Sequence, residues 1–413
     1  MFMIVWQALR WLLLAAQILI ALPLLYLCVL SISAILTARR RKTLADRSTW
    51  EEVDSRVNFA ILVPAHNEEG ILNTLLESLA RLTYPKEHYS VYVVADNCTD
   101  GTAELVRATG WAHVYERFDE TRRSKGYALS WLLQKLAENN LMYDAYVILD
   151  ADSVVIPTFL QPLAREIGQG ARAVQACNTV LNTTTSPSTA LRWIALTLVN
   201  HVRSLGRNGL GASSTLNGNG MCLTHDLLQR YPWQSFGQSE DYQYYLTLME
   251  HGERVHYVPE AVVRSQMPTT FAQMRTQDIR WESTDGSQSH WRVALRLLQA
   301  GVTSHDFKRV EAIAELLTPP LSFLAFWCLL TFVIALFLWP LPGLFISLLL
   351  IGGLLGYIGT ALYLLQPPRS VYIALLHAPG FVIWKLWVYF VLRRSKQYMG
   401  KWVRTTRSAP SIK

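Results

Sequence analysis

The feature that most constrains this chain is an uncharged, mostly apolar run from Trp11 to Leu36. The run is longer than the ~20 residues that an α-helix needs to cross the hydrocarbon core of a bilayer. A second apolar block, Leu316 to Leu392, holds candidate spans near 316–339, 343–365 and 371–392. We therefore expect an integral membrane protein with an N-terminal anchor in residues 1–43 and a C-terminal membrane region in residues 307–413.

A cleaved signal peptide is the alternative interpretation of the first run. The run is too long for the apolar region of a signal peptide and no small-residue cleavage site follows it, so a retained anchor is expected. By the positive-inside rule, the basic cluster at 38–42 then places the central domain in the cytoplasm. The membrane that we expect is a bacterial inner membrane. Basic residues at 38–42 and 393–407 suit anionic headgroups, and no nucleic-acid partner is expected.

The third C-terminal candidate leaves the topology open. Three complete C-terminal spans would put the basic tail outside, against the same rule. Pro379 lies in the middle of this candidate and Lys385 lies within it. A broken or surface-lying segment would keep the tail inside. Both alternatives, a third span and a broken segment, stand at this point.

Between the apolar blocks, residues 51–306 are expected to form one cytoplasmic α/β domain. Short apolar runs near 59–63, 91–96, 112–118 and 145–150 alternate with stretches of helical spacing near 69–82, 102–109 and 124–139. This alternation predicts a parallel sheet with both faces covered by helices. Ligands bind such sheets at the carboxyl ends of the strands, where PAHNE, DNCTD and DAD would gather.

Asp150 and Asp152 follow an apolar strand, and their carboxylates have three interpretations. They cap the next turn, they share a divalent cation, or one of them is the nucleophile of a haloacid-dehalogenase-type phosphatase. The phosphatase signature belongs on the first strand of its core, whereas this pair follows the fourth, and no G-D-x-x-x-D cluster comes later. Hard oxygen ligands at this spacing suit Mg²⁺ or Mn²⁺. The five cysteines show no CxxC or Cys/His spacing, so neither a disulfide framework nor a zinc site is expected.

Together with motifs farther along, the chain resembles the membrane-embedded inverting glycosyltransferases of family 2, and is similar to cellulose, chitin and hyaluronan synthases and to ceramide glucosyltransferases. The motifs that carry the resemblance are PAHNE (64–68), Asp96, KGYAL (125–129), DAD (150–152), GNGM (218–221), SED (239–241) and Q-x-x-R-W (277–281). The family implies a GT-A fold, a Rossmann-like nucleotide-diphospho-sugar transferase domain, and a nucleotide-sugar donor.

The resemblance also implies roles for particular residues. Asp150 and Asp152 would bind the cation, Mg²⁺ or Mn²⁺, which stabilises the leaving diphosphate. The residues implied in donor binding are Pro64, Ala65, Asn67, Glu68, Asp96, Lys125, Asp150, Gln277 and Arg280. For Lys125, a surface lysine at a helix start is the alternative. A helix or turn cap is the alternative for Asp96.

Asp241 resembles the general base of the family, with Glu240 beside it. It would take the proton of an acceptor hydroxyl as that oxygen attacks the anomeric carbon with inversion. The alternative is an acidic pair favoured by the helix dipole in a first turn. Ser239 departs from the usual threonine, and Glu282 follows the motif where many synthases have RW-x-x-G.

The acceptor is the least determined part. Trp281 would stack on it, and Gly218, Asn219 and Gly220 would lie near it, with a buried core tryptophan and a tight turn as alternatives. A glycan acceptor of a polysaccharide or oligosaccharide is favoured slightly over a membrane lipid. The stretch 186–211 is expected to lie on the membrane surface near the acceptor, with a core-packed helix as an equal alternative. A degenerate scaffold domain is disfavoured because every acidic motif is intact.

Overall fold

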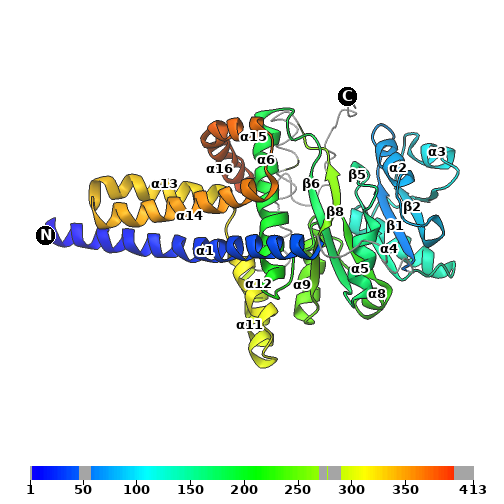
Figure 1. Cartoon of the computed structure of the whole chain (residues 1–413), viewed down its shortest axis with the longest axis horizontal. Coiled ribbons are helices and arrows are strands. Elements are labelled where there is room, and N and C mark those ends of the chain that lie inside the picture. The colour runs from blue at the N-terminus through cyan, green and yellow to red at the C-terminus, as the bar shows by residue number, and fades with distance from the viewer. Residues whose placement is uncertain (1, 46–56, 269–276, 278–289, 395–413) are drawn as a thin grey trace.

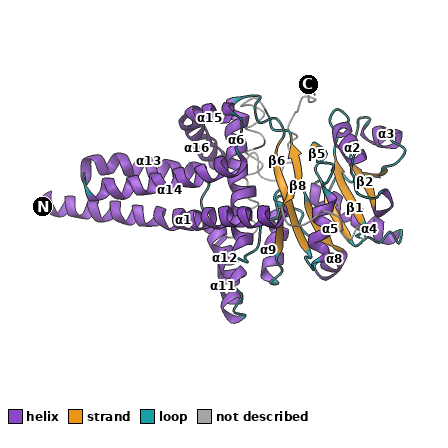
Figure 2. Ribbon diagram, in the orientation of Figure 1, coloured by secondary structure: helices purple, strands orange, loops and turns teal. Residues whose placement is uncertain are grey.

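The computed structural model describes residues 2–45, 57–268, 277 and 290–394. A bundle of long helices projects from one side of an α/β domain (Figures 1 and 2). This division matches the two kinds of sequence in the chain, the apolar blocks and the mixed region between them. The exact domain boundaries stay predictions.

The α/β domain is built on one eight-stranded sheet with the order β3-β2-β1-β4-β7-β6-β8-β5. Strands β3, β2, β1 and β4 are parallel, which confirms the prediction for the first half of the domain. The second half is mixed, because β7 runs antiparallel to β4 and β6, and β5 runs antiparallel to β8. The strands are β1 Phe59–Ala65, β2 Tyr89–Asp96, β3 His113–Arg117, β4 Ala145–Ile148, β5 Ser153–Val155, β6 Ala173–Val180, β7 Met221–Thr224 and β8 Val255–Ser265.

Helices cover both faces of this sheet. Alternate residues of β1 enter different cores: Ile61 packs with α2 and α5, and Leu62 packs with α4 and α9. Both faces of a central strand are therefore buried, which explains why its sequence is a continuous apolar run. The helices of the domain are α2 Leu72–Ala80, η1 Lys86–His88, α3 Thr102–Ala108, α4 Lys125–Glu138, α5 Leu160–Gly168, α8 His225–Arg230 and α9 Glu240–Glu250.

The first apolar run lies within one 44-residue helix, α1 Phe2–Ala45. It lies beside the hairpin of α13 Leu321–Leu338 and α14 Pro342–Leu365 (Figure 1). Buried Gln17 of α1 donates to the carbonyl of Gly343 at 2.7 Å, so a polar contact joins these otherwise apolar helices. Among the described residues, four segments are long and apolar enough to cross a membrane: Met3–Thr43, Leu321–Leu338, Pro342–Leu365 and Arg369–Val388.

The last of these segments is broken. It consists of α15 Arg369–Ala374, the short η3 Leu375–His377 and α16 Ala378–Arg394. Pro379 lies in the first turn of α16, where its missing N–H costs no hydrogen bond, so it starts a new helix rather than continuing the old one. α15 and α16 lie beside α6 and do not follow α13 and α14 to their far end (Figure 1). The helix is thus interrupted by a 3₁₀ turn, and both alternatives for its place relative to a membrane stay predictions.

The stretch 186–211 forms α6 Pro187–Thr197, η2 Leu198–Arg203 and α7 Ser204–Gly209. The prediction of a membrane-surface helix here is wrong, and the core-packed alternative holds. Arg192, Arg203 and Arg207 are all buried. Arg203 and Arg207 form ion pairs with Glu315 and Glu311 of α12 Phe307–Leu317. Arginines that bond to partners inside the protein do not face lipid headgroups.

Candidate active site

The predicted strand-end residues gather at one edge of the sheet. Strands β1, β2 and β4 are parallel neighbours, so their carboxyl ends point the same way. Asp96 is the last residue of β2, and Asp150 and Asp152 lie in the turn between β4 and β5. This edge is the one at which open α/β sheets bind ligands.

Lys125 connects three of the predicted motifs. It begins α4, whose N-cap Ser124 accepts a hydrogen bond from the backbone of Tyr127. Its Nζ lies 2.5 Å from Oδ1 of Asp150 and 3.6 Å from Oε1 of Glu240, and it donates to the carbonyl of Gly218. Burial alone would lower the pKa of Lys125, but the surrounding carboxylates outweigh it and raise the pKa above its ordinary value. The surface-lysine alternative therefore does not hold.

Glu240 and Asp241 form the first turn of α9, beside Lys125. Burial raises the pKa of Glu240 to about 7, against the opposing charge of Lys125. Burial also raises the pKa of Asp241, again opposed by Lys125. Gly218, at φ +73°, allows the close approach, because a Cβ there would lie 2.9 Å from Oδ2 of Asp241. A carboxylate with a raised pKa at this position suits a general base.

Asn219 supports the turn of Asp150 and Asp152 from behind. Its Oδ1 accepts from the backbone N–H of Asp150 at 3.1 Å, and its Nδ2 donates to the hydroxyls of Ser153 and Ser265, both at 2.8 Å. The side chain is buried and its amide is used within the protein. The motif suggested only closeness to an acceptor or a tight turn, so this support was missed. Contact of residues 218–220 with an acceptor stays a prediction.

Arg117, the last residue of β3, was not identified from the sequence. Its Nη1 donates to Oδ1 of Asp96 at 2.6 Å, and its Nη2 donates to Asp119 at 2.9 Å. Burial raises the pKa of Asp96, and the hydrogen bond from Arg117 opposes that rise. The available signal was a basic residue ending a strand next to the strand of Asp96. Arg117 thus orients the carboxylate predicted to contact the nucleotide.

The PAHNE loop is joined to the loop that follows Asp96. Pro64 and Ala65 end β1, and Asn67 adopts a positive φ of 55°. Oδ1 of Asn67 accepts from the N–H of Thr99 at 2.7 Å, and the N–H of Glu68 donates to Oγ1 of Thr102 at 2.9 Å. The two loops therefore form one connected rim at the edge predicted to bind the donor.

Gln277 is buried, and its Oε1 accepts a hydrogen bond from Nη1 of Arg192 at 2.9 Å. The first residue of the Q-x-x-R-W motif is thereby attached to α6. Arg280 and Trp281, predicted to contact the diphosphate and the acceptor, lie outside the described residues. Their roles stay predictions.

The residues at the DAD turn fit a cation that is shared with a ligand. Within the described ranges, no group of three or more His, Cys, Asp or Glu side chains could hold a metal ion. Asp150 and Asp152 supply two carboxylates, which is what Mg²⁺ commonly takes from a protein when substrate phosphates and water complete its shell. Mg²⁺ or Mn²⁺ bound together with a diphosphate matches this donor set.

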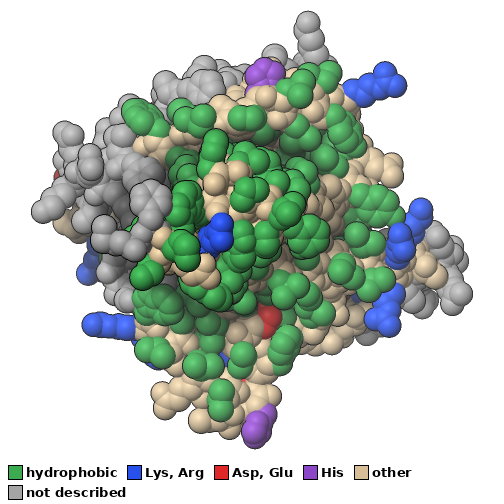
Figure 3. Space-filling model, turned by 90° about the vertical axis from the view of Figure 1, so that its left-hand side faces the viewer, with side chains coloured by type: hydrophobic (Ala, Val, Ile, Leu, Met, Phe, Trp, Pro, Cys, Tyr) green, Lys and Arg blue, Asp and Glu red, His purple; other side chains and the backbone are tan. Residues whose placement is uncertain are grey.

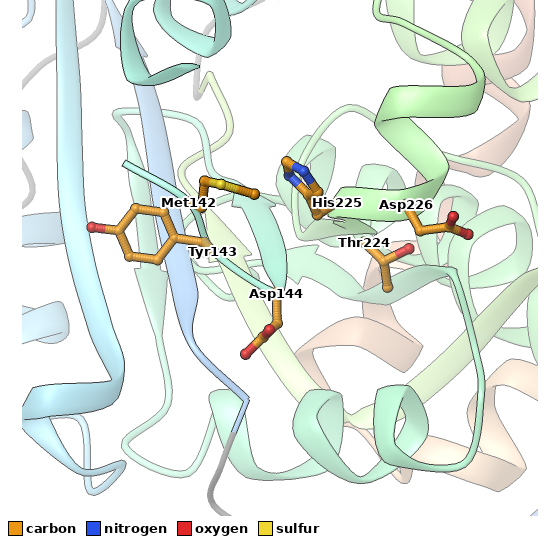
Figure 4. A pocket seen from close by; sticks show the side chains of 6 residues that line it. All are labelled: Met142, Tyr143, Asp144, Thr224, His225 and Asp226. Carbon is orange, nitrogen blue, oxygen red and sulfur yellow. The ribbon is translucent and has the colours of Figure 1, made fainter. Parts of the chain in front are cut away.

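A cavity of about 350 Å³ lies at the other end of the central strands, where β4 begins and β7 ends (Figure 4). Its lining residues are Met142, Tyr143, Asp144, Thr224, His225 and Asp226. Asp150 lies beyond the other end of β4, so this cavity is separate from the cluster around Lys125. None of the residues predicted for the site lines it.

Residues 56–284, more than half of the chain, match the family model described as glycosyltransferase like family 2. The Bacillus subtilis (strain 168) protein "Probable glycosyltransferase YdaM" is 24% identical over 247 residues, which are 56% of this chain and 56% of that protein. The Beta-monoglucosyldiacylglycerol synthase of Nostoc sp. is 31% identical over 119 residues, 28% of this chain and 24% of that protein. The chain thus spans about half or less of the length of these relatives.

Among solved structures, the mannosyltransferase PcManGT from Pyrobaculum calidifontis, in complex with GDP-Man and Mn²⁺, is similar with a TM-score of 0.50 and 17% identity. The similarity covers 88% of this chain and 98% of that one. At this identity the comparison shows the fold, which agrees with the α/β architecture predicted for residues 51–306.

Proposed function

Since the chain belongs to the family described as glycosyltransferase like family 2, we propose that it transfers a sugar from a nucleotide-sugar, a UDP-sugar, to a glycan acceptor. The linkage formed is a β-glycoside of a polysaccharide or oligosaccharide. The observation that carries the proposal is the position of Lys125, which brings Asp150, Gly218 and Glu240 into one cluster at the carboxyl edge of the sheet.

The donor binds along this edge with its nucleotide near Asp96 and its diphosphate near the DAD turn. Arg117 holds the carboxylate of Asp96 in place, and Asn219 holds the backbone of Asp150. Mg²⁺ or Mn²⁺, held by Asp150 and Asp152, supplies Lewis-acid stabilisation of the leaving diphosphate. Gln277 and Arg280 belong to the same donor site in this proposal.

Asp241 acts as the general base and accepts the proton of the attacking acceptor hydroxyl. Its carboxylate lies at the first turn of α9, next to the backbone of Gly218. Attack on the face of the sugar opposite the diphosphate inverts the anomeric configuration. The nearby ammonium of Lys125 favours the ionised form of this base and so opposes the rise in its pKa that burial causes.

The membrane part of the proposal places α1, α13 and α14 across a bacterial inner membrane with the α/β domain in the cytoplasm. The basic cluster at 38–42 supports this orientation. If α15 and α16 do not cross the membrane, an N-terminus outside and three crossings put the basic residues 393–407 inside as well. The conflict that three C-terminal spans would have produced is thereby removed.

A membrane lipid is the second candidate acceptor. One relative is named as a Beta-monoglucosyldiacylglycerol synthase, which supports a lipid acceptor for this chain too. Three crossing helices are also few for a channel that moves a growing polymer across the membrane. A glycan remains the first candidate, and the product identifies the acceptor.

Nucleotide release by the purified protein in detergent, with a panel of UDP- and GDP-sugars and Mn²⁺ or Mg²⁺, tests the proposal. We expect release with one donor, and its loss with EDTA and in Asp241→Asn. Asp226→Asn is the matched control, because Asp226 is an exposed carboxylate at the other end of the central strands. Release that Asp241→Asn leaves at the wild-type rate would refute the assignment of the base. Sizing the product separates a polymer from a glycolipid.

A further inference from the structure

Helix α11 His290–Thr303 carries an apolar stripe that no described residue covers. Its members are Trp291, Leu295, Leu298 and Val302, with exposed fractions between 44% and 67%. Their spacing of four, three and four residues places them on one face of the helix. An exposed apolar face of this length is uncommon on a surface that contacts only water.

The opposite face of α11 is part of the domain core. Val293 and Leu297 are buried and pack in the same cluster as Leu248 of α9. Arg296 forms an ion pair with Glu250 of α9 at 2.7 Å. α11 is therefore attached to the helix that carries Glu240 and Asp241, and its outward stripe faces away from that core.

α11 lies where the long helices α1, α13 and α14 meet the α/β domain (Figure 1). α11 runs across the direction of α1, α13 and α14 rather than along it, so it would lie along the surface of a bilayer that those helices cross (Figure 1). Seen from the far end of the membrane helices, hydrophobic side chains cover much of this face and extend onto its lower part, where α11 lies (Figure 3). Phe307, the first residue of α12, follows the turn after α11 and is exposed as well.

We propose that α11 is a membrane-surface helix whose stripe inserts into the boundary between the headgroups and the acyl chains of the cytoplasmic leaflet. Two features favour a lipid surface over a second copy of the chain. α11 lies where the helices expected to be in the bilayer meet the α/β domain (Figure 1), and it carries an exposed arginine, Arg292, and no acidic residue, which suits anionic headgroups. The inference rests on the proposed function only for the membrane crossing of α1, α13 and α14.

The contact adds a second attachment between the catalytic domain and the bilayer. α11 follows the segment that contains Trp281, and its inner face packs on α9. Insertion of the stripe would hold the acceptor side of the site at the lipid surface, where an acceptor carried by the membrane arrives. The sequence pattern had suggested this role for residues 186–211, but the arginines of that stretch are buried.

Spin labels on the full-length protein, in vesicles of phosphatidylethanolamine and phosphatidylglycerol, test the contact. Leu295→Cys and Leu298→Cys place a nitroxide on the stripe, and Gln299→Cys places one at an exposed polar position of the same helix. The signal of the labelled unsubstituted chain is subtracted, because Cys28 and Cys98 are partly accessible. We expect the stripe labels to be reached by oxygen and shielded from a water-soluble nickel complex, and the label at 299 to be reached by nickel.

Nickel access at positions 295 and 298 would overturn the proposal. Exclusion of both reagents with dipolar broadening at position 298 would also overturn it, by assigning the stripe to a second copy. A label at Leu329→Cys, an exposed position within α13, reports on the membrane helices themselves. Nickel access there would overturn the membrane crossing, and the lipid contact with it. These readouts need no transfer activity, so a failure of the sugar-transfer assay leaves them unaffected.

Discussion

Arg207 of α7 and Glu311 of α12 form a bidentate ion pair inside the protein, with Nε to Oε1 at 2.8 Å and Nη2 to Oε2 at 2.7 Å. Tyr26 of α1 donates to the same carboxylate at 2.6 Å, and Arg207 donates to the hydroxyl of Tyr245 on α9 at 2.9 Å. The pair thus connects α1, the first candidate membrane span, to the helix that carries Asp241. Such a buried pair contributes little to stability as a whole, yet the loss of one partner leaves an uncompensated charge.

Glu311→Gln and Arg207→Met are each expected to destabilise the protein by about 3–5 kcal/mol, because the remaining group stays buried without its partner. The double variant Arg207→Met/Glu311→Gln should be less destabilised than the sum of the two single variants. Thermal unfolding in detergent measures the three effects. The exposed pair of Arg230 and Asp226 is the control, for which about 1 kcal/mol or less is expected. Additive single effects would contradict the predicted coupling.

Arg117→Met should weaken donor binding while the protein remains folded. Without Arg117, the carboxylate of Asp96 loses a hydrogen bond of 2.6 Å and is no longer oriented. A hydrogen bond to a charged group contributes about 1.5–3 kcal/mol, so the Kd for the donor should rise about 10- to 100-fold. Titration calorimetry with UDP and Mn²⁺ measures this change. Arg107→Met, at an exposed arginine of α3, should leave the Kd unchanged.

The rate of sugar transfer should fall as the pH drops below about 7. Burial raises the pKa of Glu240 to about 7 and raises the pKa of Asp241, and the base must be ionised to accept a proton. Lys125 opposes this rise, so Lys125→Met should move the midpoint of the acid limb of kcat/KM to higher pH. The midpoint belongs to the coupled pair rather than to one residue. Lys135→Met, on the same helix but exposed, should not move it.

His201 should make the protein less stable in acid. Its ring lies in the core with Nδ1 2.7 Å from the hydroxyl of Tyr257, and burial lowers its pKa to about 4. The unfolded chain then binds a proton at a higher pH than the folded one. Stability is retained above about 6.5, the ordinary histidine value, and lost progressively as the pH falls toward 4.

The loss amounts to about 3 kcal/mol at 1.36 kcal/mol per pKa unit. Thermal unfolding in detergent at a series of pH values measures it. His201→Gln should flatten the decline between pH 6.5 and 4, because it removes the ionisable ring. His305→Gln, at an exposed histidine, serves as the control. A decline of equal slope in His201→Gln would show that other groups cause it.

Much of the fold follows from patterns that are local in the sequence. An uncharged run such as Trp11 to Leu36 predicts a long helix because lipid offers its backbone no hydrogen-bond partners. The alternation of short apolar runs with helical spacing predicted the parallel strands around β1, and acidic residues after those strands predicted the edge where Asp96 and Asp150 lie. These signals are read from neighbouring residues, so no knowledge of distant contacts is needed.

The remaining features depend on residues far apart in the chain. Arg192, Arg203 and Arg207 have helical spacing that fits a membrane surface, but contacts with distant residues, among them those of α12 and residue 277, make them core residues. Arg117 lies 21 residues from Asp96, and Arg207 lies 104 residues from Glu311. The exposed stripe of α11 is likewise a result of packing, since burial of its other face decides which apolar residues remain outside. Local patterns thus determine which elements form, whereas tertiary packing decides which charges are paired in the interior and which apolar face meets the surroundings.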